Sequence, residues 1–454
     1  MGCVDELARE ELISIILELR DRVASLEREN AELRARLGMG GGCVSSTPEW
    51  AKPNRAERRA AERAERKKRK QSFGRKLDIP TRQVEHAVEK CPDCGRKLVG
   101  GWIASKRQTI EIPQAPVEIV EHVLIARRCG VCGKVHIPKL TIADGVVGKC
   151  RVGPRLMSLI GTLAIAKRMP LRSIQKLVVG LYGLSISLGE ITQILHRLAG
   201  FARQSVQHIL RRVRGSPHAH ADETGWREDG INGYLWSFST AECRYFHFDR
   251  SRAGAVARQV LGLCFCGVLV CDFYSGYSWY DGPIQRCWVH FLRDLGKLLE
   301  AHPENASVRE WAESVRAIYK LAKKVAGRKL SERLRIKFRR ELEDRLIRVA
   351  KPYLKNESAP QRVLAERIEK HLAELFTFVE YPGCPSANNP AERAIRPAVI
   401  ARKVSGGTRS EAGSRTRTAL MTVFGTWALQ GKDLLAACQD MITQAQMPAH
   451  IPAQ

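Results

Sequence analysis

The chain has 454 residues, which at about 150 residues per domain predicts roughly three domains. Its 75 Lys and Arg residues exceed its 48 Asp and Glu residues, and the net charge of +27 indicates a polyanionic partner, most often nucleic acid. The longest apolar run, residues 261–271, is shorter than the roughly 18 residues of a membrane-spanning helix, so no membrane partner is expected. The first residues lack the apolar stretch of a signal peptide, so we expect a cytoplasmic, nucleoid-associated protein. Its 14 cysteines are then expected in metal or thiol roles rather than in disulfides.

Residues 1–38 carry the pattern of a leucine-zipper coiled coil. Two series with a spacing of seven define its a and d positions: Ile16, Val23, Asn30 and Leu37 in one, and Leu12, Leu19, Leu26 and Leu33 in the other. β-Branched residues at a with Leu at d favour a parallel dimer, and the polar Asn30 at an a position fixes its register. The alternative is a single amphipathic helix packed on the chain's own core.

Residues 39–84 form a basic linker. Between residues 51 and 76 there are twelve basic and three acidic residues, which is a third of the whole charge excess. We expect this arm to lie along DNA phosphates, with binding that weakens steeply with salt. A solvated, partly helical linker is the alternative. The densest cluster, and the candidate contact, consists of Arg66, Lys67, Lys68, Arg69 and Lys70.

Residues 85–150 contain two Cys-x-x-Cys knuckles, each followed by glycine. The four candidate ligands are Cys91, Cys94, Cys129 and Cys132. Four thiolates in tetrahedral geometry favour a closed structural Zn²⁺ site. The strand-like alternation between the knuckles is typical of a zinc ribbon. Four unrelated buried cysteines, or a redox dithiol, are the alternatives.

Residues 151–214 have helical periodicity. Two periodic stretches within residues 171–199 are joined by a Gly-containing turn, and a helix-turn-helix would place residues 189–198 in the major groove of DNA. A plain helical subdomain that supports the following region accounts for the same pattern.

From residue 216 onward the pattern alternates between strands and a helix. Strand-like runs at 217–222, 233–240 and 243–249 precede a helical stretch at 252–261 and a buried strand at 267–271. Asp222 and Asp272 end the first and fourth of these strands. If the two strands are parallel neighbours, their carboxylates lie close together, repel one another, and need a cation between them. Two hard divalent ions held by carboxylates suit in-line phosphoryl transfer.

A third carboxylate is expected from a helix packed against that sheet edge. Glu392 is the candidate, because Pro390 suits a first helical turn and either Asn388 or Asn389 can cap it. Basic side chains able to hold phosphates continue along this helix and near the fourth strand: Arg293, Arg393, Arg396, Arg402 and Lys403.

Four further residues near these carboxylates have weaker signals. Glu223 is a rival ligand, but it would point to the opposite face from Asp222. His220 shares the face of Asp222 and could lie close to the metal site or be a satisfied structural histidine. Cys287 and His290 form a Cys-x-x-His pair, which alone offers too few ligands for a metal, so a structural or positioning role is expected.

The sequence resembles the DDE transposases of insertion sequence family sixty-six, in the large transposase subunit. The matching segments are residues 220–226, Cys271 and Asp272 with the following Tyr274, Gly276 and Tyr277, residues 287–293, and residues 388–397. The zipper, the basic linker and the double Cys-x-x-Cys are also similar to that family. The resemblance implies an RNase H-like core with Asp222, Asp272 and Glu392 as its metal-binding triad, and often small accessory proteins.

The expected fold class is therefore multidomain α+β, with an RNase H-like α/β core that carries an all-helical insertion. The charges of the insertion either contact DNA or solvate its helix faces. The expected segments are a coiled coil (1–38), a basic arm (39–84), a zinc ribbon (85–150), a helical DNA-binding region (151–214), the first part of the core (215–300), the helical insertion (301–384), and the last core helices with a tail (385–454).

The expected function is that of a bacterial insertion-sequence transposase, with DNA strand cleavage and strand transfer by a DDE mechanism. The expected cofactors are two Mg²⁺ (or Mn²⁺) ions per active site and a structural Zn²⁺. The expected partners are the inverted-repeat ends, the target DNA and a second copy of the chain in a homodimer or higher oligomer. A structure-selective nuclease on the same core and a non-catalytic zinc and zipper DNA-binding protein remain alternatives.

Overall fold

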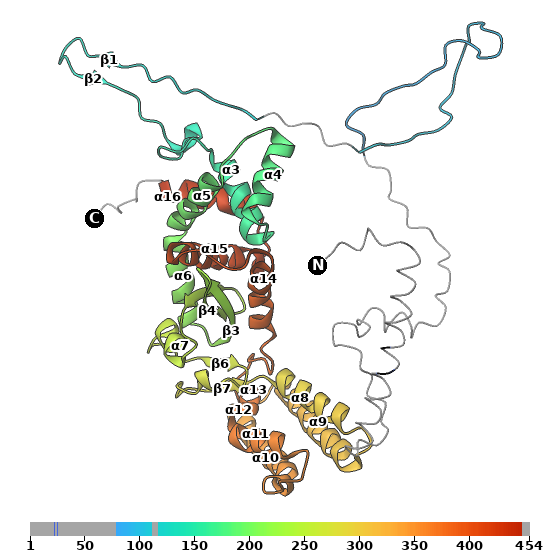
Figure 1. The fold of residues 1–454 in the computed structure, drawn as a ribbon, viewed down its shortest axis with the longest axis vertical. Coiled ribbons are helices and arrows are strands. Elements are labelled where there is room, and N and C mark those ends of the chain that lie inside the picture. Colours follow the sequence, from blue (N-terminus) through green and yellow to red (C-terminus); the bar gives the residue numbers. More distant parts are fainter. Residues whose placement is uncertain (1–21, 23–24, 26–78, 111–116, 447–454) are drawn as a thin grey trace. The chain divides into compact units, whose positions relative to one another are not determined.

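The computed structural model describes residues 22, 25, 79–110 and 117–446, and it contains two compact units, Met1–Glu111 and Ile112–Gln454 (Figure 1). The predicted basic cluster at 66–70 lies outside the described residues, as does the predicted coiled coil apart from Arg22 and Ser25, so both stay predictions. In the described part of the first unit, Lys90 and Lys97 form an antiparallel bridge around one cysteine knuckle. None of the described helices is both long and apolar enough to cross a membrane.

The second unit is mixed α+β, and its centre is a five-stranded sheet in the order β5-β4-β3-β6-β7. β3 pairs antiparallel with β4 and parallel with β6, β4 pairs antiparallel with β5, and β7 continues the parallel half. The strands are β3 (His218–Glu228), β4 (Ile231–Ser239), β5 (Arg244–Asp249), β6 (Val268–Cys271) and β7 (Ile284–Arg286). A separate two-stranded sheet consists of β1 (Arg127–Arg128) and β2 (Val135–His136).

β3 is longer than the sequence pattern predicted, because it continues past Asp222 as one arm of a β-hairpin. Its last residue, Glu228, pairs with Ile231, so only Asp229 and Gly230 form the turn. Both turn residues have positive φ, 51° and 78°, which is the conformation of a type I′ turn and explains the Asp-Gly pair there. The prediction that a strand ends at Asp222 was therefore wrong, and Asp222 lies in the middle of β3.

Helices cover the antiparallel half of the sheet. α14 (Asn389–Ser405) packs on β3 and β4, and α15 (Glu411–Leu429) packs against the edge strand β5. Alanines at helical spacing let α14 approach the sheet closely: Ala391, Ala394, Ala398 and Ala401 are all buried. Thr422 and Thr426 of α15 accept hydrogen bonds from the backbone N–H groups of Phe246 and Arg244, so α15 satisfies the exposed edge of β5.

The helices on the amino-terminal side of the sheet belong to the same hydrophobic core. They are α3 (Pro154–Gly161), the π-helical η3 (Thr162–Ala166), α4 (Leu171–Tyr182), α5 (Leu188–Phe201) and α6 (Arg203–Arg214), preceded by the short η2 (Ile142–Asp144). Gly183 ends α4 with a φ of 64°, and the Ser187 side chain caps α5. α5 buries Ile191, Ile194 and Leu198, and it leaves Gln193 and Arg197 exposed. A helix pair is thus present, while DNA recognition by α5 stays a prediction.

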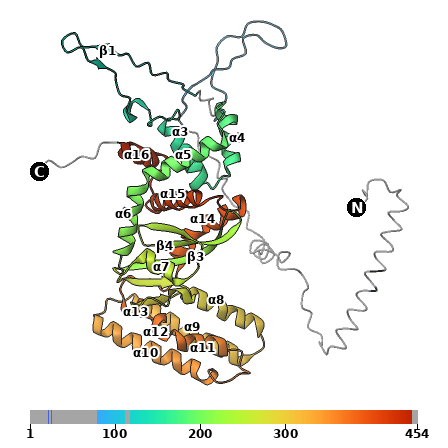
Figure 2. The ribbon, with the colours of Figure 1, turned by 60° about the vertical axis from the view of Figure 1, so that its left-hand side comes forward.

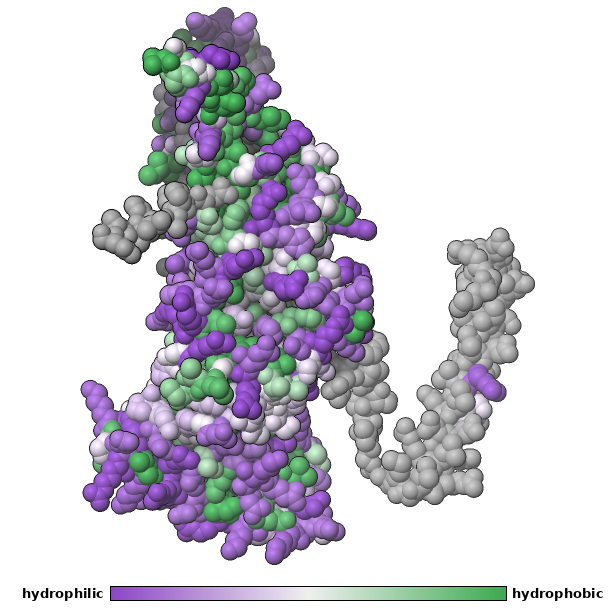
Figure 3. Space-filling view, turned by 90° about the vertical axis from the view of Figure 1, so that its left-hand side faces the viewer, coloured by the Kyte–Doolittle hydropathy of each residue, from purple (hydrophilic) through white to green (hydrophobic). Residues whose placement is uncertain are grey.

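The region between β7 and α14 is all helical and has its own hydrophobic core (Figure 2). Trp288, Phe291 and Leu295 of α8 belong to this core, together with Val268 and Val270 from one face of β6. Hydrophilic side chains dominate the visible surface of this region (Figure 3). Its elements are α8 (Trp288–Ala301), α9 (Ala306–Ala326), α10 (Glu332–Ala350), η5 (Lys351–Tyr353), α11 (Arg362–Lys370), α12 (Leu372–Leu375) and α13 (Thr377–Glu380).

Two short elements lie between β5 and β7: α7 (Gly254–Leu261) and η4 (Ser275–Tyr277). The last described helix, α16 (Leu434–Gln446), packs on α3. α7 and η4 contact one another near the loop that follows β6. That loop begins with Asp272, so the packing of α7 bears directly on the carboxylates described next.

Candidate catalytic site

The register of the sheet brings two predicted carboxylates side by side. His220 of β3 pairs with Val270 of β6, so Asp222 and Asp272, each two residues further along, occupy neighbouring positions on parallel strands. Side chains at matched positions of parallel strands point to the same face of a sheet. The two aspartates therefore share one face, although only Asp272 follows the end of its strand.

Asn388 attaches the start of α14 to this part of the sheet. Its amide nitrogen donates to the backbone oxygen of Ala221 at 2.7 Å, and its amide oxygen lies 3.1 Å from Nδ1 of His220. Its backbone N–H donates to Sγ of Cys287 at 3.1 Å. Asn388 is buried, so these three contacts fix the first turn of α14, in which the Glu392 N–H donates to the Asn388 oxygen.

The electrostatics of Asp222 depend on burial and on the acidic side chains around it. Burial raises the pKa of Asp222 to about 7, and the negative charges of Glu223, Asp272 and Glu392 add to this rise. The backbone N–H of Glu223 donates to Asp222 and opposes it. Acidic side chains from the end of β6 and from α14, up to 170 positions away in the chain, thus act on Asp222 of β3.

Glu223 lies on the other face of β3 and is already paired. Arg252 donates to its Oε1 from Nε and Nη2, at 3.0 and 2.7 Å, and the Tyr277 hydroxyl donates to its Oε2. Burial raises the pKa of Glu223, and hydrogen bonds from Tyr277 and Arg252 oppose the rise. The Arg252 guanidinium also lies 4.0 Å from the centre of the Tyr274 ring. These contacts tie Glu223 to the loop after β6.

His220 is the buried neighbour of Asp222 on the same face. Burial lowers its pKa to about 4, and the hydrogen bond to Asn388 opposes this effect. A neutral imidazole is therefore expected near pH 7, where it orients the Asn388 amide rather than contributing a charge.

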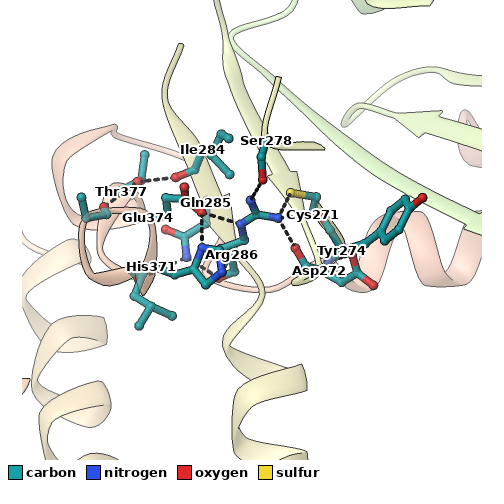
Figure 4. A network of polar contacts seen from close by, with 12 residues as sticks. Cys271, Asp272, Tyr274, Ser278, Ile284, Gln285, Arg286, His371, Glu374 and Thr377 are labelled. Carbon is teal, nitrogen blue, oxygen red and sulfur yellow. Dashed lines mark hydrogen bonds and ion pairs between the residues drawn. The ribbon is translucent and has the colours of Figure 1, made fainter. Parts of the chain in front are cut away.

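Arg286 holds the loop that starts with Asp272 (Figure 4). This fully buried guanidinium donates from Nη1 to the backbone oxygens of Asp272 and Tyr274, at 2.8 and 3.1 Å. Its Nε donates to Glu374 of α12, which also contacts Nδ1 of His371 at 2.9 Å. Arg286 therefore couples the helical region to the backbone of Asp272. No local sequence pattern predicts this pairing, since Arg286 and Glu374 are 88 positions apart.

Comparison with known proteins decides the family. The family described as Transposase IS66 family matches residues 149–416, which is more than half of the chain. The chain belongs to this family. The resemblance predicted from the motifs is thereby confirmed, and the matched residues include Asp222, Asp272 and Glu392.

A curated relative is also similar. The uncharacterized protein y4qI of Sinorhizobium fredii (strain NBRC 101917 / NGR234) is 24% identical over 331 residues, which is 64% of this chain and 59% of the relative. The chain thus spans about three fifths of the length of that relative.

Some of the predicted phosphate-binding residues are exposed to solvent, and others contact the protein itself. Arg393, Arg396 and Lys403 are exposed on α14. Arg402, in contrast, donates from Nη1 to the backbone oxygen of Gly225 and contacts the Thr224 hydroxyl, so it joins α14 to β3. Arg293 of α8 has a nitrogen 4.0 Å from Oε2 of Glu392.

Each cysteine knuckle has the same local geometry. In both, the backbone N–H of the first cysteine donates to the backbone oxygen of the residue five positions later. A glycine N–H donates to the backbone oxygen of that same cysteine, and all four distances are 2.8–3.0 Å. The glycines have φ values of 71° and 68°. Backbone N–H groups within each knuckle lower the pKa of Cys91 and of Cys129, which favours thiolates. The first knuckle (Cys91, Cys94) is in the first unit and the second (Cys129, Cys132) is in the second unit.

The Cys-x-x-His pair meets a carboxylate that the sequence did not assign to it. Ligand atoms of Cys287, His290 and Glu392 all lie within 4.8 Å of one another. The spacing of Cys287 and His290 at the start of α8 was the available signal, but their neighbour comes from a helix about 100 residues later.

Proposed function

We propose that this chain is a DNA transposase that cleaves and joins DNA strands through the carboxylates of Asp222, Asp272 and Glu392. The observation that carries the proposal is the register of β3 and β6, which puts Asp222 and Asp272 on one face of the sheet, together with the packing on β3 of α14, the helix that carries Glu392. Burial and the negative charges of Glu223, Asp272 and Glu392 raise the pKa of Asp222 to about 7. Membership of a transposase family supports the same activity. The sheet order β5-β4-β3-β6-β7 supports an RNase H-like core.

The donor set fits divalent ions with a preference for oxygen. The negative charges of Asp272 and Glu392 help to raise the pKa of Asp222, which a bound cation would offset, and Oε1 of Glu392 is buried without a hydrogen-bond partner in the described part of the chain. Hard carboxylate oxygens favour Mg²⁺ or Mn²⁺. When bound as a pair, such ions activate the attacking hydroxyl and stabilise the leaving oxygen of an in-line displacement.

The surrounding residues hold the three carboxylates in place. Asn388 fixes α14 against β3, and Arg286 fixes the backbone of Asp272. Arg293 lies beside Glu392 and offers a positive charge to a phosphate. Water or a 3′-hydroxyl attacks phosphorus, so no covalent intermediate with the protein forms.

The DNA contacts are assigned to basic side chains outside this centre. Arg393, Arg396 and Lys403 are exposed on α14, and exposed guanidinium and ammonium groups commonly bind phosphates. The basic arm and the helix pair α4–α5 are proposed to hold the inverted-repeat ends. The two knuckles are proposed to share one structural Zn²⁺. The predicted zipper is proposed to pair two protomers of a nucleoid-associated protein, and small accessory proteins to join them where required.

Strand transfer is the experiment that tests this function. The full chain is mixed with DNA that carries the ends of its own element and with a supercoiled target, with and without Mg²⁺. Joined products are expected with wild type and with the matched control Asp281→Asn, whose parent side chain is exposed. They are expected to vanish in Asp222→Asn, Asp272→Asn and Glu392→Gln.

Three outcomes would contradict the proposal. Wild-type cleavage by Asp272→Asn refutes the carboxylate assignment. Cleavage of branched DNA without joining indicates a structure-selective nuclease. Binding that is equally strong with or without Mg²⁺, with no cleavage in Mg²⁺ or Mn²⁺, indicates a non-catalytic DNA-binding protein.

A further inference from the structure

Two helix starts converge on three different ligand types. Cys287 precedes the first residue of α8, His290 lies in the first turn of α8, and Glu392 lies in the first turn of α14. Their sulfur, nitrogen and oxygen atoms lie within 4.8 Å of one another. In the described part of the chain this is the one group of three or more such side chains close enough to hold an ion.

Two of these atoms are buried and unpartnered. Nδ1 of His290 and Oε1 of Glu392 have no hydrogen-bond partner among the described residues, and they face one another at 3.6 Å. A proton between them would make a poor hydrogen bond, because N–H···O bonds rarely exceed about 3.2 Å. A bound cation, in contrast, satisfies both lone pairs at once.

The sulfur of Cys287 is buried and accepts a hydrogen bond from a backbone N–H. Burial raises the pKa of this thiol, and the backbone N–H groups of Asn388, His290 and Val289 oppose the rise. The Asn388 N–H lies 3.1 Å from the sulfur. Backbone amides that point at a cysteine sulfur stabilise its thiolate, which is the form that binds metals.

We propose that Cys287, His290 and Glu392 form a binding site for Zn²⁺ that is separate from the site formed with Asp222 and Asp272. One thiolate, one imidazole and one carboxylate suit Zn²⁺, whereas Mg²⁺ avoids sulfur and nitrogen ligands. With bonds of roughly 2.0 Å and tetrahedral angles, the nitrogen and oxygen ligands of zinc lie about 3.3 Å apart. The observed 3.6 Å is close to this value, so a small side-chain rotation closes the site.

The site leaves a fourth position for water or a ligand. The side chains of His290 and Glu392 are 29% and 28% exposed, so solvent reaches one side of the site while the sulfur stays buried. Binding releases the thiol proton to solvent and leaves the imidazole neutral. Because Glu392 belongs to both sites, zinc here competes with Mg²⁺ for that carboxylate.

Metal titration of the full chain tests this inference independently of DNA cleavage. Co²⁺ is used as a spectroscopic substitute for Zn²⁺, and bound zinc is counted by elemental analysis. Cys287→Ser and His290→Gln are each expected to bind one equivalent less than wild type and to lose part of the thiolate-to-cobalt charge-transfer band. Cys384→Ser, which removes a buried cysteine elsewhere, is the matched control and is expected to bind as wild type does.

The aspartate variants separate this site from the proposed catalytic one. Asp222→Asn and Asp272→Asn are expected to keep the equivalent that Cys287→Ser loses. Equal metal content in wild type, Cys287→Ser and His290→Gln overturns the inference. So does loss of the same equivalent in Asp222→Asn, because the ion would then belong to the carboxylate triad. His290→Gln carries the test if Cys287→Ser fails to fold, since its side chain reaches the surface.

Discussion

Replacing Asp222 by Asn should stabilise the metal-free protein while it abolishes cleavage. Burial, together with the negative charges of Glu223, Asp272 and Glu392, raises the pKa of Asp222 from 3.8 to about 7. A group with a raised pKa in the folded state supports stability fully only below its ordinary pKa, and this support is lost as the pH rises through 7. Asn carries no charge, yet its side-chain oxygen can still accept the N–H of Glu223.

The size of the effect follows from the pKa. At 1.4 kcal/mol per pH unit, the difference between the folded and unfolded pKa of Asp222 lowers the free energy of unfolding by about 2 kcal/mol at pH 5 and by about 4 kcal/mol at pH 8, relative to a residue that does not titrate. The stability advantage of Asp222→Asn over wild type should therefore grow by about 2–3 kcal/mol between these pH values. In a unit of this size, that corresponds to roughly 5 °C in the thermal midpoint.

Thermal unfolding of the full chain at pH 5 and pH 8, with chelator or with Mg²⁺, measures this difference. Mg²⁺ should stabilise wild type at pH 8 much more than it stabilises Asp222→Asn. Asp440→Asn, at an exposed position on α16, is the matched control and should show neither effect. A difference between wild type and Asp222→Asn that does not change with pH would refute the assigned electrostatics.

Four further predictions follow from individual contacts. Asn388→Ala leaves several buried groups unpaired and should lower the free energy of unfolding by about 2–4 kcal/mol in denaturant titrations; a loss below about 1 kcal/mol would contradict its assigned role. Arg286→Met should lower the free energy of unfolding by about 3–5 kcal/mol, because it leaves the Glu374 carboxylate without its ion-pair partner. Arg286→Lys should recover part of this loss, and equal stability of the two variants would contradict the network. Alanine at all five basic residues of 66–70 should reduce the slope of log affinity against log salt by about 4, and an unchanged slope excludes phosphate contacts there. Cys94→Ser and Cys132→Ser should each lose the same zinc equivalent, so a double variant that loses two equivalents would show that the knuckles bind separate ions.

The sequence predicted those parts of the site that depend on short-range patterns. Asp222 and Asp272 could be nominated because each stands in or directly after a strand-like run. The two knuckles repeat a local turn that needs glycine at positive φ, and the structure shows that turn in both. Glu392 was a weaker nomination that rested on the helix-start signal of Pro390 and on the resemblance to a family.

The sequence also misjudged one local boundary. β3 continues six residues past Asp222, because an Asp-Gly turn lets it pair along its whole length with β4. Periodicity did not reveal this, since the residues of β3 beyond Asp222 are mostly polar, include one glycine and do not alternate between apolar and polar. Hydrogen bonds to the neighbouring strand, rather than the hydrophobic pattern, extend the strand.

By itself, the sequence determined the type of secondary structure around each candidate residue, though not the end of β3, since helical and strand periodicities are local. Only the tertiary structure decided which of these residues meet. The parallel register of β3 and β6 places the two aspartates at neighbouring positions, and Asn388 fixes the first turn of α14, which carries Glu392, through contacts with β3 and Cys287. Likewise, the placement of Arg286 against Glu374, and of Glu392 against Cys287 and His290, depends on packing between segments about 90 to 105 residues apart. Such long-range packing leaves no periodic trace in the chain, because it is set by the burial of whole helices rather than by the spacing of neighbouring residues.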